Sequence, residues 1–290
     1  MLLLSLIIAH LIADFYLQTD EMVLNKLKNI KKHILHHLIL NIIVFTGCWF
    51  FLYQEVGPAK TVLWPVLFIA ATHCIIDLLK VKLVDAHMLS ENIHKLWFFI
   101  IDQVLHLVML LIALQLFYGI KMEDVFNRFS VLLMNDGVQL SLQSKLLFMA
   151  VILIFGTTVS GHIIRILLGS LPGQLLTFEG KYTFKNELNE SLYPKERGGN
   201  KGLTEEYSYM IFNKHDLSRG RLIGYIERLL VILLTFYGSY PAIAFIVTAK
   251  SIARFKQMDD RDWAEYFLLG TLTSMFLGIL SGILLREILI

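Results

Sequence analysis

The chain has 290 residues, of which 56% are hydrophobic and only 17% are charged. A soluble domain of this length carries more charge, and the apolar residues of this chain gather into runs of helix-spanning length, so the composition argues against a soluble globular protein. A formal net charge of +2 also argues against a generally basic nucleic-acid-binding protein, and no nucleic-acid partner is expected.

The hydropathy pattern predicts an all-α, polytopic integral membrane protein with about eight transmembrane helices. Their approximate ranges are 2–18, 33–53, 61–84, 94–120, 144–170, 221–237, 240–256 and 263–288. The sixth and seventh helices meet at Gly238-Ser-Tyr-Pro241, which is typical of a tight turn. Without that turn the two would form one kinked helix, and the count would fall to seven.

These helices divide the chain into five predicted parts. The parts are a four-helix membrane domain at 1–120, an extracytoplasmic connection at 121–143, a fifth membrane helix at 144–170, a flexible cytoplasmic loop at 171–220 and a C-terminal three-helix membrane segment at 221–290. We expect a surface-lying helix around Met122 to Met134 in the connection, and at most a short helix around Leu203 to Phe212 in the loop.

Positive charge is distributed unevenly among the loops. Lys and Arg concentrate in the loops that follow the first, third, fifth and seventh helices, whereas the alternate loops hold little beyond Lys60, Lys121, Arg128 and Lys145. The positive-inside rule therefore predicts that both termini are extracytoplasmic. Eight helices satisfy this alternation and seven break it.

Three pairs of polar residues spaced four apart interrupt the apolar helices. The pairs are His10/Asp14, His73/Asp77 and Asp102/His106. A spacing of four places both members of a pair on one helix face, and ionisable residues within a membrane are costly enough to indicate a function. Imidazole together with carboxylate is a common ligand set for zinc and similar divalent metals.

All three pairs are predicted to lie in the cytoplasmic half of the first four helices, at about the depth of His33, His36 and His37. We interpret this as one polar cavity that opens to the cytoplasm and holds one to three divalent ions. Within the second helix we expect His36 to be the ligand, since His33 is nearer water and His36 and His37 face different sides. The predicted metal ligands are His10, Asp14, His36, His73, Asp77, Asp102 and His106.

Other polar residues are assigned supporting roles. Asp14, Asp77 and Asp102 are the candidate catalytic carboxylates, one of them as a general base. Candidates for contacts with the ligands or the substrate are Gln18, His33, His37, Gln103, Glu227, Arg228 and Lys250. For the last three, an ion-pair network that holds the C-terminal helices together is the favoured alternative to binding of an anionic headgroup. Interhelical hydrogen bonds remain the alternative interpretation of the His/Asp pairs.

Several motifs resemble the uncharacterised bacterial membrane family DUF3307. The N-terminal motifs are His10-x3-Asp14 followed by Leu17-Gln18, Thr72-His73-x3-Asp77 and Asp102-Gln103-x2-His106. The C-terminal motifs are Gly224-x2-Glu227-Arg228, Ala249-Lys250-Ser251-x2-Arg254-Phe255 and the stretch from Ala264 to Ser274. This resemblance, which extends over nearly the whole chain, implies a multi-pass protein of the bacterial inner membrane and supplies no established activity.

A looser similarity connects the His-x3-Asp pairs with known metal chemistry. Zinc-dependent phospholipases C and P1-type nucleases hold multinuclear zinc centres with such pairs on helices, and membrane-bound metal-dependent hydrolases of the YdjM type are similarly rich in helical His and Asp. His10/Asp14 and His73/Asp77 match the pattern, and Asp102/His106 is its reverse. The similarity implies zinc as the cofactor, and it is an analogy of ligand pattern.

These observations lead to three hypotheses. The first is a membrane-embedded, metal-dependent hydrolase of a phosphoester in a lipid or lipid-linked substrate, with its site facing the cytoplasm. The second is a transporter or channel for metal ions or protons, against which the apolar outer halves of the helices argue. The third is a non-catalytic membrane anchor whose loop at 171–220 recruits a cytoplasmic protein partner.

Overall fold

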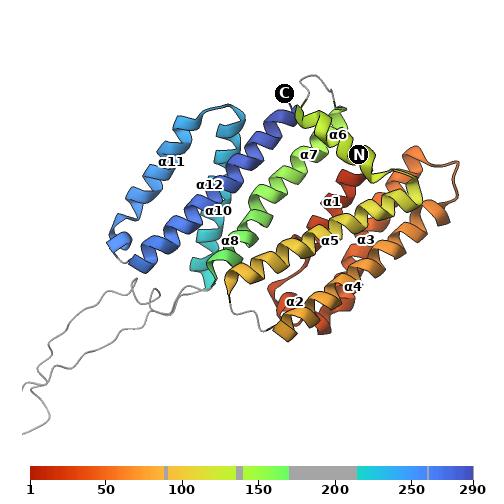
Figure 1. Cartoon of the computed structure of the whole chain (residues 1–290), viewed down its shortest axis with the longest axis horizontal. Coiled ribbons are helices and arrows are strands. Elements are labelled where there is room, and N and C mark those ends of the chain that lie inside the picture. The colour runs from red at the N-terminus through yellow and green to blue at the C-terminus, as the bar shows by residue number, and fades with distance from the viewer. Residues whose placement is uncertain (88–90, 135–139, 170–213, 260, 290) are drawn as a thin grey trace, which may run out of the picture.

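The computed structural model describes residues 1–87, 91–134, 140–169, 214–259 and 261–289. These residues are almost entirely helical and contain no strand, which confirms the all-α prediction. Figure 1 shows the N-terminal helices gathered on one side of the molecule and the C-terminal helices on the other, with α7 and α8 between them.

Five helices build the N-terminal half. They are α1 (Leu2–Ile12) with its π-helical continuation η1 (Ala13–Leu17), α2 (Asp20–Leu24), α3 (Lys26–Leu52), α4 (Trp64–His87) preceded by the π-helix η2 (Ala59–Leu63), and α5 (Asn92–Tyr118). α3 packs against α1 and α4, and α4 packs against α5. Four long segments therefore surround a common interior, and the short α2 connects two of them.

The C-terminal half consists of the remaining helices. They are α6 (Met122–Met134), α7 (Leu142–Ile154), the π-helix η3 (Phe155–Val159), α8 (Ser160–Leu168), α10 (Lys214–Phe236), α11 (Tyr240–Ala253), the 3₁₀-helix η4 (Phe255–Asp259) and α12 (Arg261–Leu289). α10 packs along α12, and α7 and α8 contact α1, α5 and α12. The predicted short helix around Leu203 to Phe212 lies outside the described residues. Of the predicted loop at 171–220, the structure describes only residues 214–220, and these form the beginning of α10 instead of loop.

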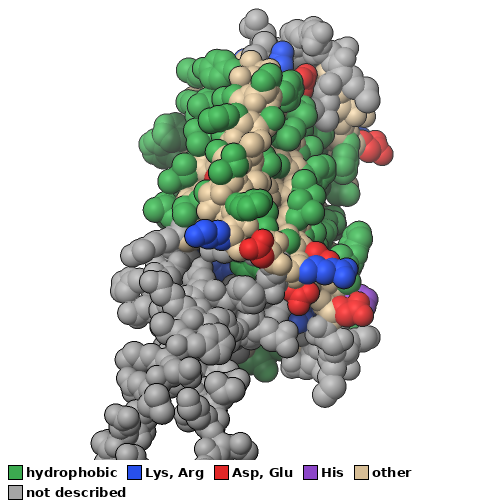
Figure 2. Space-filling model, turned by 90° about the vertical axis from the view of Figure 1, so that its left-hand side faces the viewer, with side chains coloured by type: hydrophobic (Ala, Val, Ile, Leu, Met, Phe, Trp, Pro, Cys, Tyr) green, Lys and Arg blue, Asp and Glu red, His purple; other side chains and the backbone are tan. Residues whose placement is uncertain are grey.

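Within the described residues, five helical segments are long and apolar enough to cross a membrane. They are Lys26–Phe51, Ala59–Leu83, Asn92–Tyr118, Leu142–Leu168 and Arg261–Leu289, and the segments Leu2–Leu17 and Tyr240–Ala253 are apolar but shorter. Figure 2 shows hydrophobic side chains covering the described part of the face beside α11, with charged side chains toward its ends. These features indicate a membrane protein, whereas the predicted number of eight spans remains a prediction.

Local sequence explains where several helices begin and end. Ser141 caps α7 by accepting a hydrogen bond from the backbone N–H of Ser144, and Gly119 ends α5 in the left-handed conformation (φ 67°). Gly238 (φ 69°) ends α10, and Pro241 stands in the first turn of α11. The predicted turn therefore separates the sixth and seventh helices, which excludes a single kinked helix.

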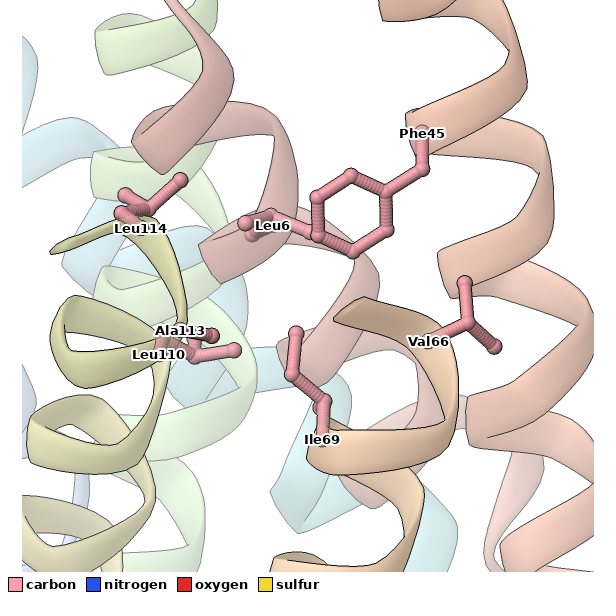
Figure 3. Close-up of a cluster of buried hydrophobic side chains, with 7 residues drawn as sticks. All are labelled: Leu6, Phe45, Val66, Ile69, Leu110, Ala113 and Leu114. Carbon is pink, nitrogen blue, oxygen red and sulfur yellow. The ribbon is translucent and has the colours of Figure 1, made fainter. Parts of the chain in front are cut away.

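An apolar layer fills the end of the N-terminal bundle that lies near α6. It consists of seven buried residues from four helices: Leu6, Phe45, Val66, Ile69, Leu110, Ala113 and Leu114. Figure 3 shows these side chains converging between the helices. Leu6, Ile69 and Leu110 each stand four residues from a histidine of the predicted site, so each of these helices turns one continuous face toward the interior.

Candidate metal centre

Four helical segments each contribute two polar residues spaced four apart to one buried group. We call this group the His/Asp cluster; it consists of His10 and Asp14 from α1 and η1, His33 and His37 from α3, His73 and Asp77 from α4, and Asp102 and His106 from α5. Asp14 lies in the π-helix that continues α1, a feature that often marks functional sites. Six of the eight residues are at most 5% exposed, and the side chains of the other two, His10 and Asp14, are 11% exposed.

The first set of donor atoms surrounds Asp14. The ring nitrogens of His10, His37 and His73 and an oxygen of Asp14 all lie within 4.8 Å of one another. His37 Nε2 lies 2.8 Å from Asp14 Oδ1, and because an ionised carboxylate can only accept, the imidazole donates this hydrogen bond. Since His33 Nε2 also lies 3.5 Å from Asp14 Oδ1, Asp14 has four imidazoles around it, from three different helical segments.

Two further sets of donor atoms are linked to the first set through shared residues. The second contains His33, His73 and Asp77, and the third contains Asp77, Asp102 and His106. His33 Nε2 and His73 Nε2 face each other at 3.0 Å, so at most one of them can donate a proton to the other. Since His73 and Asp77 each belong to two sets, the donor atoms form a continuous row across the bundle.

The third set has three acceptor atoms that no hydrogen bond satisfies. His106 Nδ1 donates to the backbone carbonyl of Asp102 at 2.8 Å, so Nε2 of this ring carries a free lone pair. Within the described residues, His106 Nε2, Asp77 Oδ2 and Asp102 Oδ1 are buried without a hydrogen-bond partner. Buried acceptors without donors are unfavourable, and a cation between them would remove that cost.

Two lysines neutralise the outer oxygens of the same carboxylates. Lys26 Nζ lies 2.6 Å from Asp77 Oδ1, and Lys80 Nζ lies 2.7 Å from Asp102 Oδ2. The lysine side chains are 15% and 28% exposed, whereas their carboxylate partners are 3% and 5% exposed. In the sequence, Lys26 and Lys80 are only part of the positive charge near the loops after the first and third predicted helices, because pairing across helices is not visible in the spacing along one helix.

Gln103 connects the two ends of the His/Asp cluster. Its amide nitrogen lies 3.4 Å from Asp14 Oδ2 and 3.3 Å from Asp102 Oδ2, and its amide oxygen lies 3.4 Å from His10 Nε2. The side chain therefore reaches three residues that lie on α1, η1 and α5. The role of a supporting contact, which the position of Gln103 beside Asp102 suggests, stays a prediction.

The structure corrects the assignment of the ligand in the second predicted helix. His33 and His37 are each 2% exposed and belong to the cluster, whereas His36 belongs to none of the donor sets in the described part of the chain. The helix begins at Lys26, two turns before His33, so His33 lies well inside it. The apolar run that predicted a start near residue 33 does not include the preceding lysines, which are helical as well.

The remaining predicted residues lie elsewhere. Gln18 ends η1 in an extended conformation and makes no hydrogen bond to the cluster within the described residues. Lys250 Nζ pairs with Glu227 Oε2 at 2.6 Å, which joins α10 and α11. Arg228 is buried and donates to the carbonyls of Gly156 and Thr157 at 2.6 and 2.8 Å, so it binds the backbone of η3.

The composition of the donor row fits a divalent metal centre. It contains five imidazoles and three carboxylates, and the cysteines Cys48 and Cys74 are in none of its donor sets. Imidazole nitrogen and carboxylate oxygen together suit zinc and neighbouring divalent metals. Three overlapping sets offer places for as many as three ions.

A comparison with protein-family models identifies a family whose model matches the part of the chain that contains the His/Asp cluster. Residues 2–133 match the family model described as "Protein of unknown function (DUF3307)". The resemblance to DUF3307 is thereby confirmed over this part of the chain. All eight residues of the His/Asp cluster lie within the matched DUF3307 region, and the C-terminal motifs lie beyond it. No curated protein and no solved structure matches the chain.

Proposed function

We propose that this protein is a membrane-embedded, metal-dependent hydrolase that cleaves a phosphoester in a lipid or lipid-linked substrate. The proposed site is the His/Asp cluster, holding one to three divalent ions, with zinc best suited to its donor atoms. The observation that carries the proposal is the buried row of overlapping donor sets, one of which has three unsatisfied acceptors.

Electrostatics favour a metal centre over a network of hydrogen bonds alone. The cluster contains three carboxylates, and the two lysines offset only part of their charge. Hydrogen bonds among the imidazoles and Asp14 leave the inner oxygens of Asp77 and Asp102 without donors. A divalent cation would supply the missing positive charge and satisfy these oxygens together with His106 Nε2.

The side chains have distinct proposed roles. A divalent ion held by such donors supplies Lewis acidity toward a phosphoryl oxygen and makes a water molecule more acidic. Asp77 and Asp102 each keep one inner oxygen free of hydrogen bonds; where one of these oxygens holds the ion, the other would accept a proton from water as a general base. Asp14 is held by His37 and acts chiefly as a ligand.

The apolar layer supports a site with access from one side. Its residues follow the cluster on the inner faces of α1, α3, α4 and α5 and fill the end of the bundle near α6. A conducting pathway for ions or protons needs polar groups across the whole membrane, and this layer offers none among the described residues. We therefore favour the hydrolase over a transporter or channel.

Metal analysis of the purified full chain tests the proposal. We expect one to three equivalents of a divalent metal in the wild type, and clear losses in His73→Ala and Asp77→Ala, since these two residues each belong to two donor sets. The exposed His94→Ala and Asp124→Ala serve as controls that keep wild-type metal content. Equal metal content in wild type, cluster variants and controls would contradict a metal centre.

Activity is tested separately on the metal-containing protein. We expect release of a phosphorylated headgroup or phosphate from a panel of phospholipids, its loss after treatment with a chelator, and its return with zinc. A protein that holds metal but cleaves no phosphoester in this panel would contradict the hydrolase and leave the metal centre intact. Uptake of metal ions into proteoliposomes would instead support the transporter.

A further inference from the structure

Each of the two lysine–carboxylate ion pairs uses only one oxygen of its carboxylate, so the other oxygen can bind a different partner. Lys26 holds only the outer oxygen of Asp77, and Lys80 holds only the outer oxygen of Asp102. The inner oxygen of each carboxylate is one of the unsatisfied acceptors of the third donor set. Each carboxylate therefore has a lysine on its outer side and a proposed metal position on its inner side.

The charge balance of the cluster changes when metal is present. With neutral imidazoles, three carboxylates and two lysines give a net charge of −1 in the absence of metal. Two divalent ions would change this to +3. The ions would then neutralise Asp77 and Asp102, and the lysines would no longer be needed as counterions in a medium of low dielectric constant.

Resting on the proposed function, we propose that Lys26 and Lys80 form a binding subsite for the phosphate group of the substrate at the edge of the metal centre. Both ammonium groups are partly exposed, and both lie within hydrogen-bond distance of carboxylates in the third donor set. Lysine has a long, flexible stem and three rotatable donors, so each ammonium can turn from a carboxylate to a phosphate oxygen without movement of its helix.

The geometry favours a phosphate group over a neutral ligand. Two cations on adjacent helices, α3 and α4, flank the same row of donor atoms, and both would carry uncompensated charge once metal is bound. A phosphate group has enough oxygens to contact the metal and both ammonium groups at once. A lipid headgroup and free phosphate share this chemistry, and they are separated by experiment.

The chain provides a matched control for each lysine. Lys28 lies two residues after Lys26 on α3, and Lys82 lies two residues after Lys80 on α4; both are exposed. The test variants are Lys26→Met and Lys80→Met, which keep the length of the stem and remove the charge. The controls are Lys28→Met and Lys82→Met, and the conservative variants Lys26→Arg and Lys80→Arg retain the charge.

The experiment measures metal content and anion binding on the same samples. Purified full-length protein is loaded with zinc, freed of excess metal, and titrated calorimetrically with inorganic phosphate and, in a second series, with short-chain phosphatidic acid. We expect each Met variant to bind the anion about tenfold more weakly, because it loses one charge-assisted hydrogen bond to the phosphate group. We expect its metal content to equal that of the wild type, and the Arg variants to recover most of the anion affinity.

The outcomes separate this inference from the proposed function. A wild type without metal would overturn both. A wild type that holds metal but binds neither anion, or Met variants whose anion affinity equals that of the controls in both series, would overturn the lysine subsite alone. Loss of affinity for phosphatidic acid but not for phosphate would identify a lipid headgroup as the ligand. Loss in both series would show that the phosphate group is sufficient.

Discussion

The imidazoles of α3 that enter the His/Asp cluster are selected by helix geometry. His33 and His37 stand four residues apart and are both almost completely buried, so they share the face that meets α1 and α4. His36 precedes His37 by one residue, and a rotation of about 100° per residue turns it toward a different side of the helix. Neighbours in sequence therefore have different surroundings.

This difference leads to a prediction for metal affinity. We expect His37→Ala to weaken metal binding at least about tenfold, because loss of even a supporting contact of a metal ligand commonly costs 10–100-fold. We expect His36→Ala to leave metal affinity unchanged, since His36 is absent from the donor sets of the described residues. Competition with a chromogenic chelator measures both variants. An equal loss of metal affinity in the two variants would contradict the observation that His37, and not His36, lies on the face of α3 that meets the cluster.

At the scale of helices, α10 and α12 are held together by close backbone approach. A Cβ atom added at Gly282 would lie 2.9 Å from the carbonyl oxygen of Ile232, and one added at Gly278 would lie 2.9 Å from a methyl group of Val231. Arg228 fixes the same helix α10 to the carbonyls of η3. Glycine is therefore required for close packing at these positions, as is common between membrane helices.

Two glycine substitutions should change stability in opposite directions. We expect Gly282→Ala to lower stability by about 1–3 kcal/mol, because the obstructing atom belongs to the backbone and cannot rotate away. Gly47→Ala meets nothing within 4 Å and should stabilise α3 by about 0.5–1 kcal/mol through helix propensity. Apparent melting temperatures in one detergent compare the two. A Gly282→Ala variant as stable as the wild type would contradict the observed packing.

The parts of the site that could be predicted from sequence are those that depend on a single helix. The spacing of His10/Asp14, His73/Asp77 and Asp102/His106 fixes a shared face whatever the helix packs against. Pairing between helices depends on how the helices cross, so the ion pairs of Lys26 and Lys80 could not be read from spacing. The prediction that His33 lies nearer water was wrong for a different reason. Hydropathy detects only the apolar run, whereas the helix itself begins in the basic segment before it.

At the scale of the whole molecule, the two termini lie at the same end of the bundle, near α6 (Figure 1). The His/Asp cluster lies toward the opposite end, where α3 and α5 begin. An even number of membrane passes would produce this arrangement, whereas the side of the membrane on which the termini lie stays a prediction from the distribution of Lys and Arg. The proposed location is the bacterial inner membrane, with both termini outside the cytoplasm.

Cysteine labelling in cells measures this sidedness. In a background without Cys48 and Cys74, we expect Lys28→Cys to be protected from a membrane-impermeant maleimide and Glu123→Cys to react with it, since these exposed positions lie at opposite ends of the bundle. Permeabilised cells provide the control, because both cysteines should then react. The reverse pattern would place the cluster near the outer surface and contradict access from the cytoplasm.

The order of the cluster residues along the chain has a consequence for biogenesis. All eight residues are part of the nascent chain once His106 has been added, before α7, α10 and α12 are synthesised. At about 5–20 residues per second, the rest of the chain requires roughly 10–40 s more. During this interval the newly inserted helices carry their carboxylates, and Lys26 and Lys80 can compensate two of these charges at once. Insertion into the bilayer would therefore not have to wait for delivery of the proposed metal.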